Sequence, residues 1–257
     1  MAWTKTYDGA EPVRVNKWLA QAGVCSRREA EALIEAGQVF IDGERIKDVG
    51  RKIAPGQTLL LNDRAEAGLA AQVSVVINKP VGIVSAQPEG DQIPAARLLK
   101  RETQVGGGPV PSSKASLAPV GRLDQDSHGL LILSEDGVLA KAVIGPDSQV
   151  DKEYRVTVRG RVDRAKIALL RHGLELDERK LKPAKVTLED TQVLRFVLIE
   201  GRNRQIRRMC ELVELEVTDL VRVRIGAVKL GDLPEGRWRH LKADEREALV
   251  AAAGPKT

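Results

Sequence analysis

Asp124 has a setting that suits chemistry, because it sits in a short loop with a glycine at each end. It closes the motif Gly121-Arg-Leu-Asp124, and Gly129 stands just before an apolar segment, 130–133, that predicts a strand. An ionised carboxylate can attack as a nucleophile or accept a proton. Arg122, two residues away, could keep this carboxylate ionised. An ordinary Asx turn at a strand entrance would also place an aspartate here, so this position alone leaves both interpretations open.

Asp126, Ser127 and His128 follow in the same loop and raise the possibility of a serine hydrolase. Neighbours in sequence do not have triad geometry, and no nucleophile-elbow motif surrounds Ser127. We keep a hydrolase as the third hypothesis. It predicts inhibition by serine-directed reagents.

Tyr154 is one of only two tyrosines and lies in a segment, 154–158, that alternates apolar and basic residues like a half-buried strand. A lone tyrosine on such a strand is usually part of a core. Its other use is to stack on one extruded base and to exchange a proton with it. Aromatic residues make up only 3% of the chain, which disfavours a stacked-aromatic platform for single strands.

Four arginines crowd the start of a predicted helix at 203–213: Arg202, Arg204, Arg207 and Arg208. Cations are unfavourable at the positive end of a helix dipole. Their presence there therefore indicates an anion nearby, such as phosphate or carboxylate. The alternative is a surface helix with solvated arginines.

The composition is that of a globular protein with a mildly basic balance. The 257 residues are 42% hydrophobic and 30% charged, with a net charge of +5. We expect a cytoplasmic protein without a membrane span, because no apolar run reaches the required length and the N-terminus lacks an apolar signal region. Two distant cysteines, three scattered histidines and the lack of a glycine-rich phosphate loop predict neither a metal nor a cofactor.

The N-terminal segment, 13–61, predicts a small α+β module. A helix over 15–22 is followed by Ser26-Arg-Arg-Glu29, which has the pattern of a capping box, and Asp42-Gly43 predicts a hairpin turn. Arg14 and Lys17 fall on the first helix, and Arg27 and Arg28 open the second. These four basic residues could meet phosphates.

The rest of the chain predicts a second, larger domain. We expect a linker at 62–72, a domain at 73–250 that is large enough to hold a catalytic site, and a flexible tail at 251–257. A stretch rich in glycine, proline and serine, about 87–118, predicts a mobile loop. Strands in series with interspersed helices favour a mixed or antiparallel sheet with flanking helices, which is α+β.

Four motifs in order, behind an S4-like module, make the sequence similar to the RsuA/RluB/RluE/RluF family of ribosomal RNA pseudouridine synthases, over about 13–249. The segments VRVNKWLAQAGVCSRREAEALI and VFIDGERI resemble an S4 RNA-binding domain. The segments NKPVG, GRLDQDSHGLLILSEDG, KEYRVTVRG and EGRNRQIRRMCE resemble the catalytic domain. The RluF branch of the family, which acts on large-subunit (23S) rRNA, is the most similar.

The resemblance implies that a uridine in RNA is isomerised to pseudouridine without cofactor or metal. It places the catalytic aspartate at Asp124, the active-site tyrosine at Tyr154, and the basic partner of the aspartate at Arg207. The uridine must leave its stack to expose its ribose. We also predict that these basic residues contact RNA: Arg14, Lys17, Arg27, Arg28, Lys79, Arg122, Arg202, Arg204 and Arg208.

The predicted partner is ribosomal RNA, most simply that of the large subunit, and the protein is expected to be a monomer. The same isomerase acting on 16S rRNA or on tRNA is the first alternative. The second hypothesis is a non-catalytic S4-type factor that binds RNA or the ribosome. The sequence does not choose between attack of Asp124 on C1′ and its assistance to proton removal at C2′.

Overall fold

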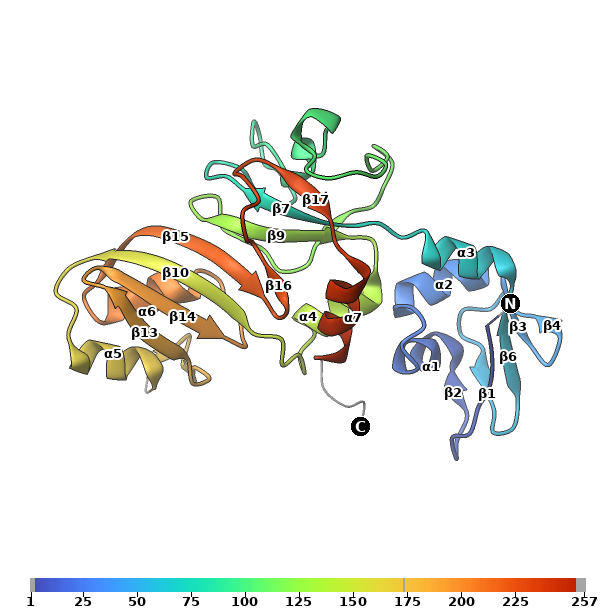
Figure 1. Ribbon diagram of the computed structural model, residues 1–257. Coiled ribbons are helices and arrows are strands. Elements are labelled where there is room, and N and C mark those ends of the chain that lie inside the picture. Colours follow the sequence, from blue (N-terminus) through green and yellow to red (C-terminus); the bar gives the residue numbers. More distant parts are fainter. Residues whose placement is uncertain (1–2, 173, 253–257) are drawn as a thin grey trace. The chain divides into compact units, whose positions relative to one another are not determined.

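The computed structural model describes residues 3–172 and 174–252, and the chain divides into two compact units. The described part of the first unit is 3–73 with 134–141. That of the second is 74–133, 142–172 and 174–252. Both units combine helices and sheet (Figure 1), which confirms the α+β class.

The first unit packs two helices and a third, later one against a small antiparallel sheet in the order β1-β6-β3-β4. Its elements are β1 (Thr4–Thr6), β2 (Val13–Arg14), α1 (Val15–Gln21), α2 (Arg27–Glu35), β3 (Val39–Ile41), β4 (Glu44–Arg45), β5 (Lys52–Ile53), β6 (Thr58–Leu61) and α3 (Asp63–Ala70). The predicted turn is present, because Asp42 and Gly43 both have positive φ, at 49° and 83°.

Local sequence determines how the second helix begins. The Ser26 hydroxyl accepts a hydrogen bond from the Glu29 amide, and the Glu29 carboxylate accepts one from the Ser26 amide. This confirms the capping box, which satisfies two amide groups that a helix start otherwise leaves unpaired. Arg14, in contrast, ends strand β2 and is not a residue of the first helix.

The predicted linker at 62–72 is instead largely helical. The Asn62 side chain accepts a hydrogen bond from the Ala65 amide and so caps α3. Ala65 is fully buried and Leu69 packs against the same core. The mostly polar composition of this segment favours a linker. The segment is instead an amphipathic helix that presents only a few apolar residues to the core.

The second unit is built on a nine-stranded sheet. Seven of its strands follow the order β13-β14-β10-β15-β9-β7-β17, while β8 pairs with β9 and β16 pairs with β15. The strands are β7 (Ser74–Lys79), β8 (Ala118–Pro119), β9 (His128–Ser134), β10 (Lys152–Arg159), β13 (Lys185–Asp190), β14 (Val193–Leu198), β15 (Glu216–Ile225), β16 (Val228–Lys229) and β17 (Trp238–His240). The pairing of β15 with β9 is parallel, whereas β10 pairs antiparallel with both β14 and β15. This confirms the predicted mixed sheet.

Helices and a small hairpin complete this unit (Figure 1): α5 (Arg164–Arg171), α6 (Gln205–Leu212), α7 (Ala243–Ala251), and the hairpin β11 (Glu175–Leu176) with β12 (Arg179–Lys180). Helix α4 (Gly137–Ile144) begins in the first unit and ends in the second. Helix α6 buries Ile206, Met209 and Cys210 in a core that also holds Val156 and Phe196 from the sheet. This buried stripe fixes which side of α6 faces the cleft described below.

The long segment predicted as a mobile loop, about 87–118, carries two short 3-10 helices, η1 (Ala95–Leu98) and η2 (Arg101–Thr103). The indole of Trp238 donates a hydrogen bond to the Lys100 carbonyl at 2.8 Å, which ties this part of the segment to β17. Its mobility stays a prediction. Of the predicted tail, residues 253–257 lie outside the described residues. None of the helices in the described ranges could cross a bilayer.

Candidate active site

A cleft of about 670 Å³ opens in the second unit where the Asp124 loop meets β10, β15 and the start of α6. Its lining combines polar side chains of the loop and of the helix start with apolar side chains such as Val143, Leu198 and Leu220. The residues that matter below are Asp124, Tyr154, Lys152, Arg204, Arg207 and Arg222. Segments far apart in sequence therefore converge on one hollow.

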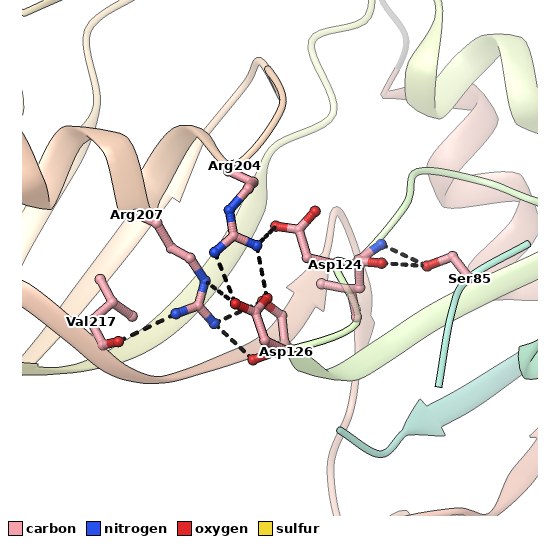
Figure 2. Close-up of polar contacts among 8 residues, drawn as sticks. Ser85, Asp124, Asp126, Arg204, Arg207 and Val217 are labelled. Carbon is pink, nitrogen blue, oxygen red and sulfur yellow. Dashed lines mark hydrogen bonds and ion pairs between the residues drawn. The ribbon is translucent and has the colours of Figure 1, made fainter. Parts of the chain in front are cut away.

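Asp124 lies in the loop between β8 and β9, and its side chain is 30% exposed. The backbone next to Asp124 is held by Ser85. The Ser85 hydroxyl donates to the Leu123 carbonyl at 2.7 Å and accepts from the Leu123 amide at 2.8 Å. The carboxylate thus faces the cleft on a backbone that is held at the preceding residue (Figure 2).

Arg204, just before the start of α6, and Arg207, within α6, converge on Asp126, as Figure 2 shows. Arg204 binds this carboxylate with both terminal nitrogens, at 3.1 and 2.9 Å, and reaches an oxygen of Asp124 at 3.8 Å. Arg207 approaches Asp126 with its Nε at 3.4 Å and donates to the Asp126 carbonyl at 2.7 Å. The hydrogen bonds from Arg204, with the charge of Arg207, hold the pKa of Asp126 below its usual value.

The predicted pairing of Asp124 with Arg207 is therefore wrong in this structure. Arg207 is partnered by Asp126, and the cation nearest to Asp124 is Arg204. The reason lies in the start of α6, where Arg204 adopts a left-handed conformation with φ of 49°. That turn brings Arg204 across both carboxylates. Arg122 forms no ion pair with Asp124 within the described residues.

Tyr154 and Lys152 lie two residues apart on β10, and both line the cleft. Tyr154 is half-buried against the core. The Lys152 amine is buried and donates to the Val143 and Val150 carbonyls at 2.9 and 3.0 Å. Burial, and then the charge of Arg222, lower the pKa of Lys152 to about 8.

Lys79 does not fit its predicted role as an RNA contact. It is fully buried, and its amine donates to the Pro80 and Ile83 carbonyls. Burial is the main cause that lowers the pKa of Lys79 to about 8. The prediction is wrong because the lysine at the end of β7 turns inward and braces the loop that follows.

The hydrolase hypothesis finds no triad. His128 pairs with Asp219 at 2.9 Å, while the buried Ser127 hydroxyl accepts from Arg207 at 3.2 Å. Serine and histidine thus have separate partners. Among the described residues there is also no group of three or more His, Cys, Asp or Glu side chains placed to hold a metal ion.

The two remaining arginines of the cluster brace the β11–β12 hairpin. Arg202 donates to the Leu176 and Lys180 carbonyls at 2.8 and 3.0 Å. Arg208 binds Asp177 with two hydrogen bonds, at 3.0 and 2.7 Å. Arg202 nevertheless lines the cleft. In the first unit, the four predicted RNA contacts on β2, α1 and α2 are all exposed.

Sequence reasoning missed Lys152, Arg222 and the role of Asp126. The alternation in KEYRVTVRG could have placed Lys152 on the face of Tyr154. For Arg222 and Asp126 the sequence held no comparable signal, because their roles depend on contacts between distant segments.

Known proteins that are similar to this chain are RNA pseudouridine synthases. A family model described as RNA pseudouridylate synthase matches residues 73–212, and an S4 domain model matches residues 13–59. The dual-specificity RNA pseudouridine synthase RluF of Escherichia coli K12 is 37% identical over 235 residues, which cover 91% of this chain and 77% of RluF.

Two further matches cover nearly the whole chain. An uncharacterized RNA pseudouridine synthase of Aquifex aeolicus is 32% identical, over 95% of this chain and 96% of its own. A crystal structure of a pseudouridylate synthase superposes with a TM-score of 0.62 at 26% identity, covering 92% of this chain and 99% of that one.

Proposed function

This chain belongs to the RNA pseudouridylate synthase family and is an isomerase of uridine in RNA, and we propose that Asp124 is the carboxylate that acts on the ribose. The observation that supports this role is the shared cleft. Asp124 and Tyr154 line one hollow of about 670 Å³, a volume that suits a single nucleotide. The match of the family model over 73–212 sets aside the non-catalytic hypothesis.

The chemistry requires an extruded nucleotide and a closed set of groups around it. The C1′–N1 bond breaks, the uracil turns, and a bond from C1′ to C5 forms. C5 loses a proton and N1 gains one, so the net composition is unchanged. Asp124 acts on the sugar, either as nucleophile at C1′ or as base at C2′, and both roles need the ionised carboxylate.

Tyr154 is proposed to hold the detached uracil and to exchange its proton. Its ring lies in the cleft wall, where a base can stack on it, and its hydroxyl can serve as acid or base. Arg207 is proposed to act indirectly, as a positioning residue, because it grips Asp126 and the backbone beside Asp124.

We propose a uridine of large-subunit rRNA as the target. The similarity of the motifs to the RluF branch supports this choice. The printed name of the E. coli relative includes dual specificity, which makes tRNA the second RNA to test. A monomer is proposed, because Asp124 and Tyr154 reach the same cleft from one chain.

RNA is proposed to bind along exposed and half-buried basic side chains of both units. These are Arg14, Lys17, Arg27, Arg28, Arg122, Arg202, Arg204 and Arg208. Their contacts with phosphates would make affinity fall steeply as salt rises, because binding releases counterions. An affinity that does not change with salt would contradict this part of the proposal.

The test is a map of pseudouridines in rRNA and tRNA from cells with and without the gene. The deletion strain is complemented with the wild type, with Asp124→Asn, and with Asp232→Asn, which changes an exposed aspartate outside the cleft. We expect a uridine of large-subunit rRNA that is modified only with the wild type and the Asp232→Asn control. Identical maps in all strains would contradict the proposal.

A further inference from the structure

Two of the most exposed large apolar side chains among the described residues belong to segments that contact the Asp124 loop. Val81, just after β7, is 56% exposed, and Ile93 is 54% exposed. Neither residue lines the cleft, so the cleft does not account for their exposure. A single exposed apolar residue is ordinary, but two that lie together beside a site indicate a contact surface.

Gln125 joins the segments that carry these two side chains. Its side-chain amide donates to the Gly82 carbonyl at 3.1 Å, and its Oε1 accepts from the Gln92 side chain at 3.3 Å. Gly82 follows Val81 in the chain and Gln92 precedes Ile93, so both apolar residues adjoin one glutamine. We call Val81, Ile93 and Gln125 the flanking patch.

The flanking patch is built against the residues on either side of Asp124. The Gly82 amide donates to the Gln125 carbonyl at 2.8 Å, and the Ser85 hydroxyl holds both the amide and the carbonyl of Leu123 (Figure 2). One short segment therefore binds both sequence neighbours of Asp124. An RNA strand that delivers a uridine to this carboxylate brings a neighbouring nucleotide close to the patch.

The turn that carries Val81 is held in shape by the protein itself. Gly82 has a φ of 88°, a conformation that glycine adopts readily. The buried amine of Lys79 donates to the Pro80 and Ile83 carbonyls and so fixes the turn from within. Apolar side chains on a braced turn lose little conformational freedom when a partner covers them, which favours binding.

The charges near the patch restrict which part of an RNA can contact it. Glu89 and Asp91 are both exposed just before Ile93, and they would repel a phosphate. An apolar surface suits the face of a base instead. Two aliphatic side chains are also far fewer than the roughly 20–30 residues of a stable protein interface, but they match the face of a single base.

We infer that the flanking patch binds the base next to the target uridine, through contact of Val81 and Ile93 with the face that the extruded uridine leaves uncovered. Covering that face with aliphatic side chains offsets part of the cost of unstacking. The patch thus acts on RNA binding and not on the bonds that react. The inference rests on the proposed role of Asp124, which brings the target uridine beside the patch.

The test pairs a change in the protein with a change in the RNA. The double variant Val81→Ala/Ile93→Ala is compared with Leu169→Ala/Leu188→Ala, which truncates two aliphatic side chains that are 48% and 47% exposed and lie outside the cleft lining. The RNA is a fragment centred on the uridine that the map identifies. It is made with its natural neighbours, with an abasic nucleotide on the 5′ side, and with one on the 3′ side.

On the natural fragment we expect the Val81/Ile93 variant to have a Kd about tenfold above wild type, because two aliphatic contacts are lost. Its single-turnover rate at saturating RNA and its Tm should stay close to wild type, as should all values of the Leu169/Leu188 control. On one of the two abasic fragments, wild type should bind as weakly as the variant, and the variant should lose nothing further.

Two results would overturn the inference. One is a Kd of the Val81/Ile93 variant within about twofold of wild type on the natural fragment. The other is a loss in the variant that is as large on both abasic fragments as on the natural one. Sedimentation adds a third contrary outcome, since a wild-type dimer that the variant converts to a monomer, with an unchanged Kd for RNA, would assign the patch to a second copy of this chain.

Asp124→Asn is measured on the same fragments to separate the two proposals. An active Asp124→Asn overturns the proposed function. An inactive Asp124→Asn, beside a Val81/Ile93 variant that binds every fragment like wild type, overturns only the role of the flanking patch. Identical pseudouridine maps with and without the gene overturn both.

Discussion

Two groups of basic side chains on neighbouring strands of the same sheet differ in their partners, which are carboxylates for one group and main-chain carbonyls for the other. Arg195 and Arg224 both bind Glu153, the first with two hydrogen bonds at 2.7 and 3.0 Å, and Arg224 also binds Asp151 with two. Arg222 and Lys152 donate only to carbonyls. In the first group charge is cancelled, while in the second it is retained beside the cleft.

The difference teaches which charges serve structure and which serve the site. A cancelled network lies outside the cleft lining and stabilises the sheet. Uncancelled cations at a cleft cost stability, but they favour the polyanionic RNA and any negative charge that develops on a departing uracil. Changes in the first group should therefore affect stability alone, whereas changes in the second should affect rate and, because the charge is buried, stability as well.

After a change of Asp124 itself, the largest effect in the cleft is expected from Tyr154→Phe. The change keeps the ring that can stack on uracil and removes the hydroxyl that handles a proton. We expect the single-turnover rate to fall by about 10²-fold or more, the usual contribution of general acid–base catalysis, with little change in Kd. Pseudouridine formation in rRNA from the deletion strain measures it. A wild-type rate would contradict a role of the Tyr154 hydroxyl in proton transfer.

Asp126→Asn should have a smaller effect on rate. It removes the negative charge that engages Arg204 and Arg207, so both can turn toward Asp124 or toward RNA phosphates. We expect about a tenfold lower rate and a somewhat lower Kd. Filter binding and single-turnover assays test this, with Asp232→Asn as the matched exposed control. An unchanged rate would show that the arginines do not depend on this carboxylate.

Glu153→Gln should act on stability alone. Hydrogen bonds from Arg195, then Arg224, lower the pKa of Glu153 to about 2. Its stabilisation is therefore full above the unfolded pKa of about 4.5 and is lost as pH falls toward 2. At pH 7 we expect the variant to lose about 1–2 kcal/mol in urea unfolding and to keep its rate. A lower rate with an unchanged free energy of unfolding would contradict the assignment of Glu153 to a purely structural network.

The smallest effect is a pH dependence of unfolding due to Lys152. Its folded pKa is lowered to about 8 from an unfolded value of 10.5, so the folded protein releases this proton first. Between these pH values the unfolded state binds more protons, and stability contributed by this group rises with pH. Lys152→Met should lack that rise, by on the order of 1 kcal/mol. Parallel urea curves for both proteins at pH 7 and 9.5 would contradict it.

Local patterns in the sequence predicted local structure well. The Ser26–Glu29 capping box and the turn at Asp42-Gly43 involve residues within a few positions of each other, so their geometry follows from residue type. The strand that carries Tyr154 followed from alternation. These features also established the α+β class, because each domain is a series of such units.

Contacts between distant segments could not be predicted in this way. Arg207 was matched to Asp124, but the left-handed turn at Arg204 and the course of the loop bring it to Asp126. Lys79 was expected to contact RNA, yet it is fully buried, and its amine donates to the carbonyls of Pro80 and Ile83 in the chain after β7. The partners of Arg222 are about a hundred residues away and depend on a bulge, which leaves no local trace in the sequence.

The central claim is that one carboxylate, Asp124, acts on the sugar of an extruded uridine. The most direct measurement is single-turnover pseudouridine formation by Asp124→Asn at saturating rRNA, with Kd determined on the same preparation. The account predicts a rate at least about 10³-fold below wild type, as for loss of a group that forms or assists the reacting bond, and a Kd within about threefold. Pseudouridine formed at the wild-type rate by the Asn variant would contradict it.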